Sequence, residues 1–210
     1  MAAPFGHLVT TVDELREELY PEPPAKAWAK EVPTLDRHCR DFIERSPFAL
    51  LGTSDAQGRC DVTPRGGPAG FARVLAPDRL AFADLTGNRR LDALRNVLEN
   101  PQVGLLFLIP GLRETLRVNG RAYLTRDPEV LRACDVPART ADLAVGIIVE
   151  TAFLHCAKAL IRSQLWEPES WPPSDELPSA AEILRDHRGS NTTVAQLEDE
   201  LSEAYTSRLW

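Results

Sequence analysis

The stretch of sequence that decides the fold runs from Ser46 to Asp84 and reads SPFALLGTSDAQGRCDVTPRGGPAGFARVLAPDRLAFAD. Short apolar runs alternate in it with turn residues such as those of Asp55–Gly58 and Ala76–Asp78, which is typical of antiparallel strands joined by tight turns. The pattern predicts two consecutive hairpins, with strands at residues 48–53, 60–65, 71–75 and 79–84.

Three further apolar segments follow the two hairpins. They lie at residues 103–109, 114–125 and 143–155, and a helix is predicted between the hairpins and the first of them. That helix runs from about Arg89 to Asn100, because apolar residues recur at helical spacing and Pro101 ends the pattern. The residues thus predict a mainly β domain of six or seven strands, which is enough to close a small barrel.

Helical segments flank the predicted sheet. We expect a helical arm over residues 1–45, the barrel over 46–165 and a helical extension over 166–210 that packs on the barrel or on a partner subunit. In the arm, Thr11 with Glu14 has the pattern of a capping box, and Thr34 is the expected cap of a second helix. The extension contains two helical patterns, near residues 179–186 and 193–208.

The composition excludes several classes of protein. The net charge is −7, and basic residues are interspersed with acidic ones, so neither nucleic acid nor an anionic membrane is an expected partner. The sequence predicts no signal peptide and no membrane span, and we expect a cytoplasmic protein. The four cysteines are widely spaced, which predicts free, buried thiols and no metal site.

A candidate anion site precedes the single internal helix. Thr86-Gly-Asn-Arg-Arg90 leads into its first turn, so backbone N–H groups, the helix dipole and two guanidinium groups can converge there. Arg65 and Arg73 lie on neighbouring predicted strands and could join Arg89 and Arg90 around one phosphate. The alternative is that Arg89 and Arg90 pair with Asp92 and Glu99 on an exposed helix face.

The order of these segments resembles the flavin-binding split-barrel family related to pyridoxamine 5'-phosphate oxidase. The resemblance covers nearly the whole chain, and its end, Phe153–Trp166, is similar to a bacterial subgroup of FMN-dependent members. The segments that carry it are Ser46–Thr53, Asp61–Gly66, Gly70–Leu75, Gly87–Asp92, Leu94–Phe107 and Leu116–Ala122.

The resemblance implies a six-stranded antiparallel split β-barrel in a homodimer, with FMN in clefts between the subunits. Thr115 falls where the oxidase has a flavin-contacting glutamine, and the oxidase's terminal Trp and Arg signature is missing. The oxidase's substrate is therefore not carried over to this chain. The resemblance assigns flavin contacts to Arg73, Val74 and Leu75, and phosphate contacts to Asn88, Arg89 and Arg90.

The segment after the last strand supplies candidates for the flavin-facing end. A cation near the flavin would stabilise its anionic reduced form, and Trp166 could stack on the ring. Alternatively, Lys158 and Arg162, four residues apart, form the solvated stripe of a helix. The expected cofactor-binding residues are Arg65, Arg73, Val74, Leu75, Asp84, Asn88, Arg89, Arg90, Lys158, Arg162, Ser163 and Trp166, and the catalytic candidates are Lys158, Ser163 and His155.

These features predict an FMN-dependent oxidoreductase acting on an unidentified small molecule, with a nicotinamide as a possible reductant. Two alternatives remain open. One is a reductase that uses the deazaflavin F420, whose longer acidic tail would favour further Lys and Arg along the cleft. The other is a protein that binds flavin or haem without turnover, since a fold does not establish chemistry.

Overall fold

The computed structural model describes residues 5–85, 87, 89–135, 141–189 and 191–207. The chain divides into two compact units, Met1–Glu31 and Val32–Trp210. The first unit contains the short helices α1 (Val12–Glu14) and α2 (Ala25–Trp28), with a π-helical turn at Leu15–Leu19 between them. Thr11 caps α1 by accepting a hydrogen bond from the Glu14 amide, as the sequence predicts.

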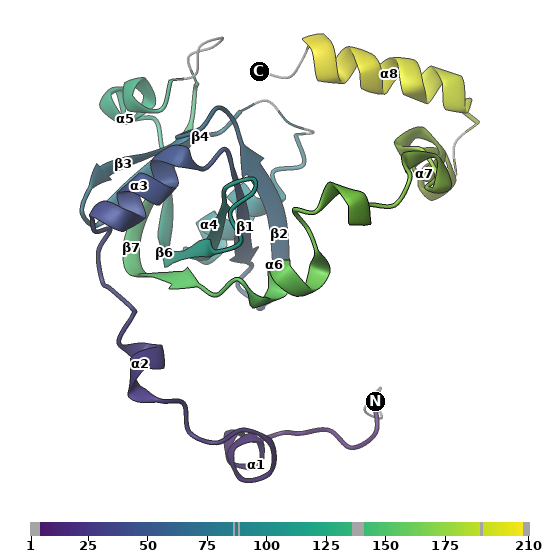
Figure 1. The fold of residues 1–210 in the computed structure, drawn as a ribbon. Coiled ribbons are helices and arrows are strands. Elements are labelled where there is room, and N and C mark those ends of the chain that lie inside the picture. Colours follow the sequence, from purple (N-terminus) through teal and green to yellow (C-terminus); the bar gives the residue numbers. More distant parts are fainter. Residues whose placement is uncertain (1–4, 86, 88, 136–140, 190, 208–210) are drawn as a thin grey trace. The chain divides into compact units, whose positions relative to one another are not determined.

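The second unit is built on one antiparallel sheet of seven strands in the order β2-β1-β5-β6-β7-β4-β3 (Figure 1). Every predicted strand is present, with ends within one residue of the expected ones. The strands are β1 (Phe48–Ser54), β2 (Cys60–Gly66), β3 (Ala72–Ala76), β4 (Arg79–Ala83), β5 (Gln102–Leu108), β6 (Thr115–Thr125) and β7 (Ala144–His155).

The count of six strands implied by the family resemblance is wrong for this chain. All seven segments form ladders, and β2 pairs with β1 in continuous register from Phe48↔Gly66 to Ser54↔Cys60. β2 and β3 are the two edges of the sheet. The edge position explains how Pro64, which has no N–H to donate, is tolerated within β2.

The sheet curls around a shared apolar interior. Phe71, just before β3, contacts Phe82 of β4 and Phe107 of β5, with ring centroids 6.2 Å and 6.4 Å apart. β4 and β5 are separated in the sheet by β6 and β7, so these contacts cross the interior. The inward-facing residues of all strands except the edge strand β2 belong to this core.

Two helices pack against this core. They are α3 (Arg37–Arg45), which lies against β3 and β6, and α4 (Asp92–Glu99), which lies against β1, β2 and β6. The expected cap at Thr34 is wrong: Asp36 is the N-cap, and its carboxylate accepts a 2.8 Å bond from the Cys39 amide. A carboxylate is the stronger acceptor here because it also complements the helix dipole.

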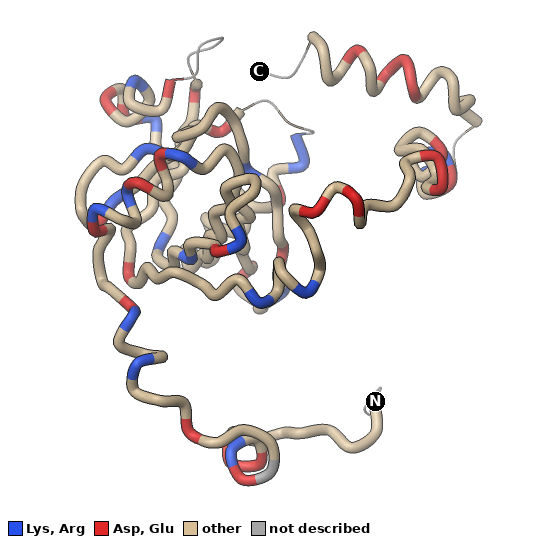
Figure 2. The backbone as a smooth tube through the Cα atoms, in the orientation of Figure 1, with Lys and Arg blue, Asp and Glu red and all other residues tan. Residues whose placement is uncertain are grey.

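The remaining helices are α5 (Pro128–Ala133), α6 (Lys158–Ser163), α7 (Ala180–Arg188) and α8 (Val194–Ser207), with 3-10 turns at Pro168–Ser170 and Ser174–Glu176. α7 and α8 pack against each other. Figure 2 shows acidic and basic residues scattered over the described chain, with acidic residues alone along α8. No helix in the described part of the chain is long and apolar enough to cross a membrane. All four cysteines are free, and Cys60 and Cys156 are exposed rather than buried.

Candidate functional site

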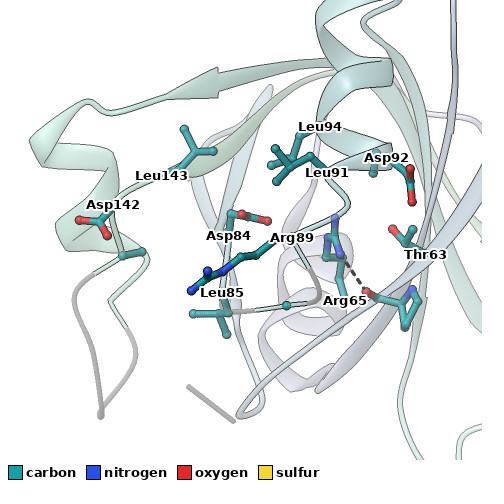
Figure 3. A pocket seen from close by; sticks show the side chains of 14 residues that line it. Thr63, Arg65, Asp84, Leu85, Arg89, Leu91, Asp92, Leu94, Asp142 and Leu143 are labelled. Carbon is teal, nitrogen blue, oxygen red and sulfur yellow. Dashed lines mark hydrogen bonds between the residues drawn. The ribbon is translucent and has the colours of Figure 1, made fainter. Parts of the chain in front are cut away.

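A pocket of about 570 Å³ opens between β2, the end of β4, the turn before α4 and the segment before β7. Its volume lies in the usual range for small-molecule sites. One part of its wall is polar, with Thr63, Arg65, Asp84 and Arg89 (Figure 3). The apolar part of the wall is formed by Pro64, Leu85, Leu91, Ala93, Leu94, Ala141 and Leu143.

The inward face of β2 supplies two of the polar groups. Alternate residues of this strand, Asp61, Thr63 and Arg65, are partly buried, while those between them are exposed. The Asp61 Oδ2, Thr63 Oγ1 and Arg65 Nε atoms are buried and have no hydrogen-bond partner among the described residues. Buried polar atoms are normally paired, so this row is suited to a ligand that supplies the missing partners.

The turn before α4 supplies the second guanidinium. Arg89 and Leu91 both adopt left-handed backbone conformations, with φ of 60° and 62°. Such conformations cost roughly 1–2 kcal/mol in non-glycine residues and cluster at functional sites. The Arg89 guanidinium lines the pocket and forms no ion pair with any described residue. Asn88, which we expected at the same site, lies outside the described residues.

Arg65 and Arg89 therefore present two positive charges that no described carboxylate neutralises by direct contact. Arg65 donates one bond, from Nη1 to the Pro64 carbonyl oxygen at 3.2 Å. A guanidinium held by a carbonyl keeps its charge and its other donors available for an anion. The pocket can hold a phosphate or carboxylate group against these arginines, while its leucine side chains contact an apolar part of the same ligand.

Asp84 is one of three carboxyl groups that line the pocket, together with Asp92 and Asp142. Its backbone N–H donates to the Leu143 carbonyl at 2.9 Å, which joins the end of β4 to the segment leading into β7. Burial raises the pKa of the Asp84 carboxyl group, and the nearby charge of Arg65 partly offsets this effect.

Arg90 lies away from this pocket. Its Nε donates to the Asp92 carboxylate at 2.7 Å, which is the pairing considered as the alternative to a phosphate contact. Together with Asp61, Arg95 and other residues, Arg90 lines a neighbouring hollow of about 320 Å³. The turn thus directs its two arginines to different places.

The residues of β3 are divided between the two faces of the sheet. Val74 packs on the core, whereas Arg73 and Leu75 are exposed on the opposite face. Burial raises the pKa of the Cys134 thiol to about 11, and the charge of Arg73 lies close enough to oppose that shift. None of these three β3 residues lines the pocket.

The candidates after β7 do not line the pocket within one chain. Lys158, Arg162 and Ser163 are exposed on α6, and the Ser163 hydroxyl donates to the Leu160 carbonyl at 3.1 Å. The Trp166 indole N–H donates to the Leu112 carbonyl at 2.8 Å, which fixes this segment to the β5–β6 turn. His155 lies opposite Thr115 in the β6–β7 ladder.

Several lining residues were missed by sequence reasoning. Thr63 shares the inward face of β2 with Arg65, so strand alternation could have identified it. Leu91 and Leu94 belong to the apolar residues that recur at helical spacing between Arg89 and Asn100, a pattern that predicts a helix face and not a ligand contact. Asp142 and Leu143 reach the pocket from just before β7, and no local pattern in the sequence indicates that contact.

Fold and site together define a mainly antiparallel β protein with a pocket that two arginines line beside an edge strand. The sequence profile of the pyridoxamine 5'-phosphate oxidase family matches residues 35–152, which is more than half of the chain. The chain therefore belongs to the pyridoxamine 5'-phosphate oxidase family. No curated protein matches it.

Solved structures with a similar fold come from several bacteria. A putative pyridoxamine 5'-phosphate oxidase from Lactobacillus delbrueckii is 20% identical, with a TM-score of 0.47 over 58% of this chain and 95% of the other. An FMN-binding protein from Syntrophomonas wolfei is 10% identical, with a TM-score of 0.44 over 58% and 88%. HutZ, the heme storage protein from Vibrio cholerae, is 16% identical, with a TM-score of 0.40 over 58% and 93%.

Proposed function

We propose that the protein is a homodimeric FMN-dependent oxidoreductase that acts on a small molecule, with a nicotinamide as a possible reductant. The observation that carries the proposal is the pair Arg65 and Arg89, two guanidinium groups that have no carboxylate partner among the described residues, in a pocket of suitable size. Membership of the family supports FMN as the ligand that these arginines hold.

The residues present fit this cofactor at its phosphate end. Arg65 and Arg89 would bind the phosphate, and the unpartnered Thr63 hydroxyl and Arg65 Nε would gain hydrogen bonds. Leucine side chains of the same pocket offer an apolar surface to a ring. When bound, FMN supplies hydride or electron transfer, while this chain's residues bind, orient and shield it.

The function is tested first by the absorbance spectrum of the purified protein and by chromatography of any small molecule that heat releases from it. We expect an oxidised flavin spectrum and released FMN, or stoichiometric uptake of added FMN by colourless protein. A deazaflavin or haem spectrum would favour the corresponding alternative instead. Colourless protein that takes up none of these ligands would contradict the proposal.

The outer face of the sheet supports the proposed dimer. On this face, Gly52 of β1 and Gly104 of β5 lie side by side in register and carry no side chains of their own, and the Asn119 side chain of β6 lies against Gly104. Leu50 and Leu106 are the next pair along the same face, and both are partly exposed. These two leucines belong to a row of five residues that are in register across five strands. The row consists of Pro64 in β2, Leu50 in β1, Leu106 in β5, Arg117 in β6 and Phe153 in β7.

A dimer through this face would be disrupted by a charge at its centre. We expect Leu106→Glu to convert the protein to a monomer and to lower FMN occupancy at least tenfold, because removing a carboxylate from water in an interface costs several kcal/mol, which its cross-strand neighbour Arg117 offsets only in part. Light scattering coupled to size-exclusion chromatography measures the mass. Leu98→Glu, at a position on α4 that is 74% exposed, is the matched control and should leave the mass unchanged. An unchanged dimer in Leu106→Glu would exclude this face.

A further inference from the structure

A carboxyl group lies in the wall of the pocket that the two arginines make attractive to anions. Asp84 follows β4 directly and is partly buried, and Figure 3 shows it among the charged side chains of this wall. An ionised carboxylate at this position opposes a phosphate that Arg65 and Arg89 attract. Partial burial of Asp84 reduces the screening by water and so strengthens this opposition.

The charged groups around Asp84 come from four elements. Arg65 faces the pocket from β2, Arg89 from the turn before α4, Asp92 from α4 and Asp142 from the segment before β7. Asp92 is paired with Arg90, and Asp142 is exposed. Asp84 and Asp92 are both partly buried, but Asp92 is held by Arg90, whereas the charge of Arg65 acts on Asp84.

We propose that Asp84 is a specificity-determining residue of this pocket, which disfavours highly charged phosphate ligands and strengthens the binding of FMN when its carboxyl group is protonated. A neutral Asp84 no longer repels the phosphate, and its O–H can donate a hydrogen bond to a ligand oxygen. Burial raises the pKa of Asp84, so the proton is retained to a higher pH than on an exposed aspartate. The inference rests on the proposed function, namely that this pocket holds the FMN phosphate.

The consequence is a selection between flavin-like ligands. A ligand with one phosphate places a single charged group near Asp84, whereas a cofactor with a longer acidic tail brings further negative charge to a pocket that already contains three carboxyl groups. The charge of the Asp84 carboxyl group should not change the affinity for riboflavin, which has the ring and the ribityl chain but no phosphate. Riboflavin is therefore the probe that separates a charge effect from a change of shape.

The test measures FMN and riboflavin affinities by flavin fluorescence, for the wild type and Asp84→Asn at pH 8 and pH 5. Asparagine keeps the shape and a donor but has no charge. At pH 8 we expect Asp84→Asn to bind FMN about tenfold more tightly, the factor equivalent to one pKa unit of coupling. This ratio should fall toward one at pH 5, because a proton on Asp84 removes its charge and a proton on the phosphate weakens any repulsion that remains. Riboflavin should bind both proteins equally.

Asp78→Asn is the control for net charge, because Asp78 is exposed in the β3–β4 turn and does not line the pocket. It should bind FMN as the wild type does. Equal FMN affinities of wild type and Asp84→Asn at pH 8, or an equal gain for riboflavin, would overturn the role of Asp84 and leave the proposed function intact. Absence of FMN binding by every variant would overturn the proposed function and this inference with it.

Discussion

The double substitution Arg65→Ala with Arg89→Ala is expected to weaken FMN binding by about 100-fold or more while the protein remains folded. A hydrogen bond to a charged group contributes roughly 1.5–3 kcal/mol, and each 1.4 kcal/mol is a factor of ten in affinity. The fold should tolerate the change because neither guanidinium forms an ion pair with a described residue, and Arg89 is exposed. Loss of the Arg89 side chain removes no contact with the apolar core. Fluorescence titration with FMN measures the affinity, and circular dichroism confirms the fold.

Arg90→Ala is the matched control for that experiment. Arg90 is adjacent in sequence and has the same side chain, but it is paired with Asp92 at 2.7 Å and lines the neighbouring hollow. Its loss should change FMN affinity less than threefold, since exposed ion pairs contribute about 1 kcal/mol or less. A large effect of Arg90→Ala together with a small effect of the double substitution would place the phosphate in the neighbouring hollow instead.

The strands could be predicted closely from the sequence because their information is local. Apolar runs and the turn residues between them located all seven strands. The polar edge strand Cys60–Gly66 was located by the hairpin turn that precedes it. The order of the strands in the sheet could not be read from that pattern. β1 pairs with β5 and β4 with β7, and such pairings depend on packing between segments far apart in the chain.

The candidate site was predictable to the extent that its residues lie on regular elements. Arg65 is identified by its strand and Arg89 by the helix start that follows it, and both line the pocket. The different directions of Arg89 and Arg90 were not predictable, since they depend on left-handed conformations at Arg89 and Leu91 that the sequence does not indicate. The arrangement of α6 against a flavin depends on the proposed partner subunit, so one chain's sequence cannot specify it.

Gly120 is a position where the fold tolerates no side chain. It lies in β6 at the point where the register with β7 shifts, between the pairs Asn119↔Thr151 and Gly120↔Val149. A Cβ atom added to Gly120 would overlap the backbone carbonyl oxygen of Ile148. The obstacle is backbone rather than the end of a flexible side chain, so it cannot turn aside.

Gly120→Ala is therefore expected to lower the free energy of unfolding by about 3 kcal/mol or more, the upper range for overpacking a buried site. For a chain of this length that corresponds to a fall of roughly 10 °C in melting temperature. Gly146→Ala is the matched control on the neighbouring strand, because its added Cβ would lie 3.8 Å from the Tyr123 carbonyl oxygen, an ordinary contact. It should cost less than about 1 kcal/mol. Equal melting temperatures for the two variants would contradict this prediction. They would show that β6 and β7 can move apart at the register shift, and so make room for a Cβ atom at residue 120, without loss of stability.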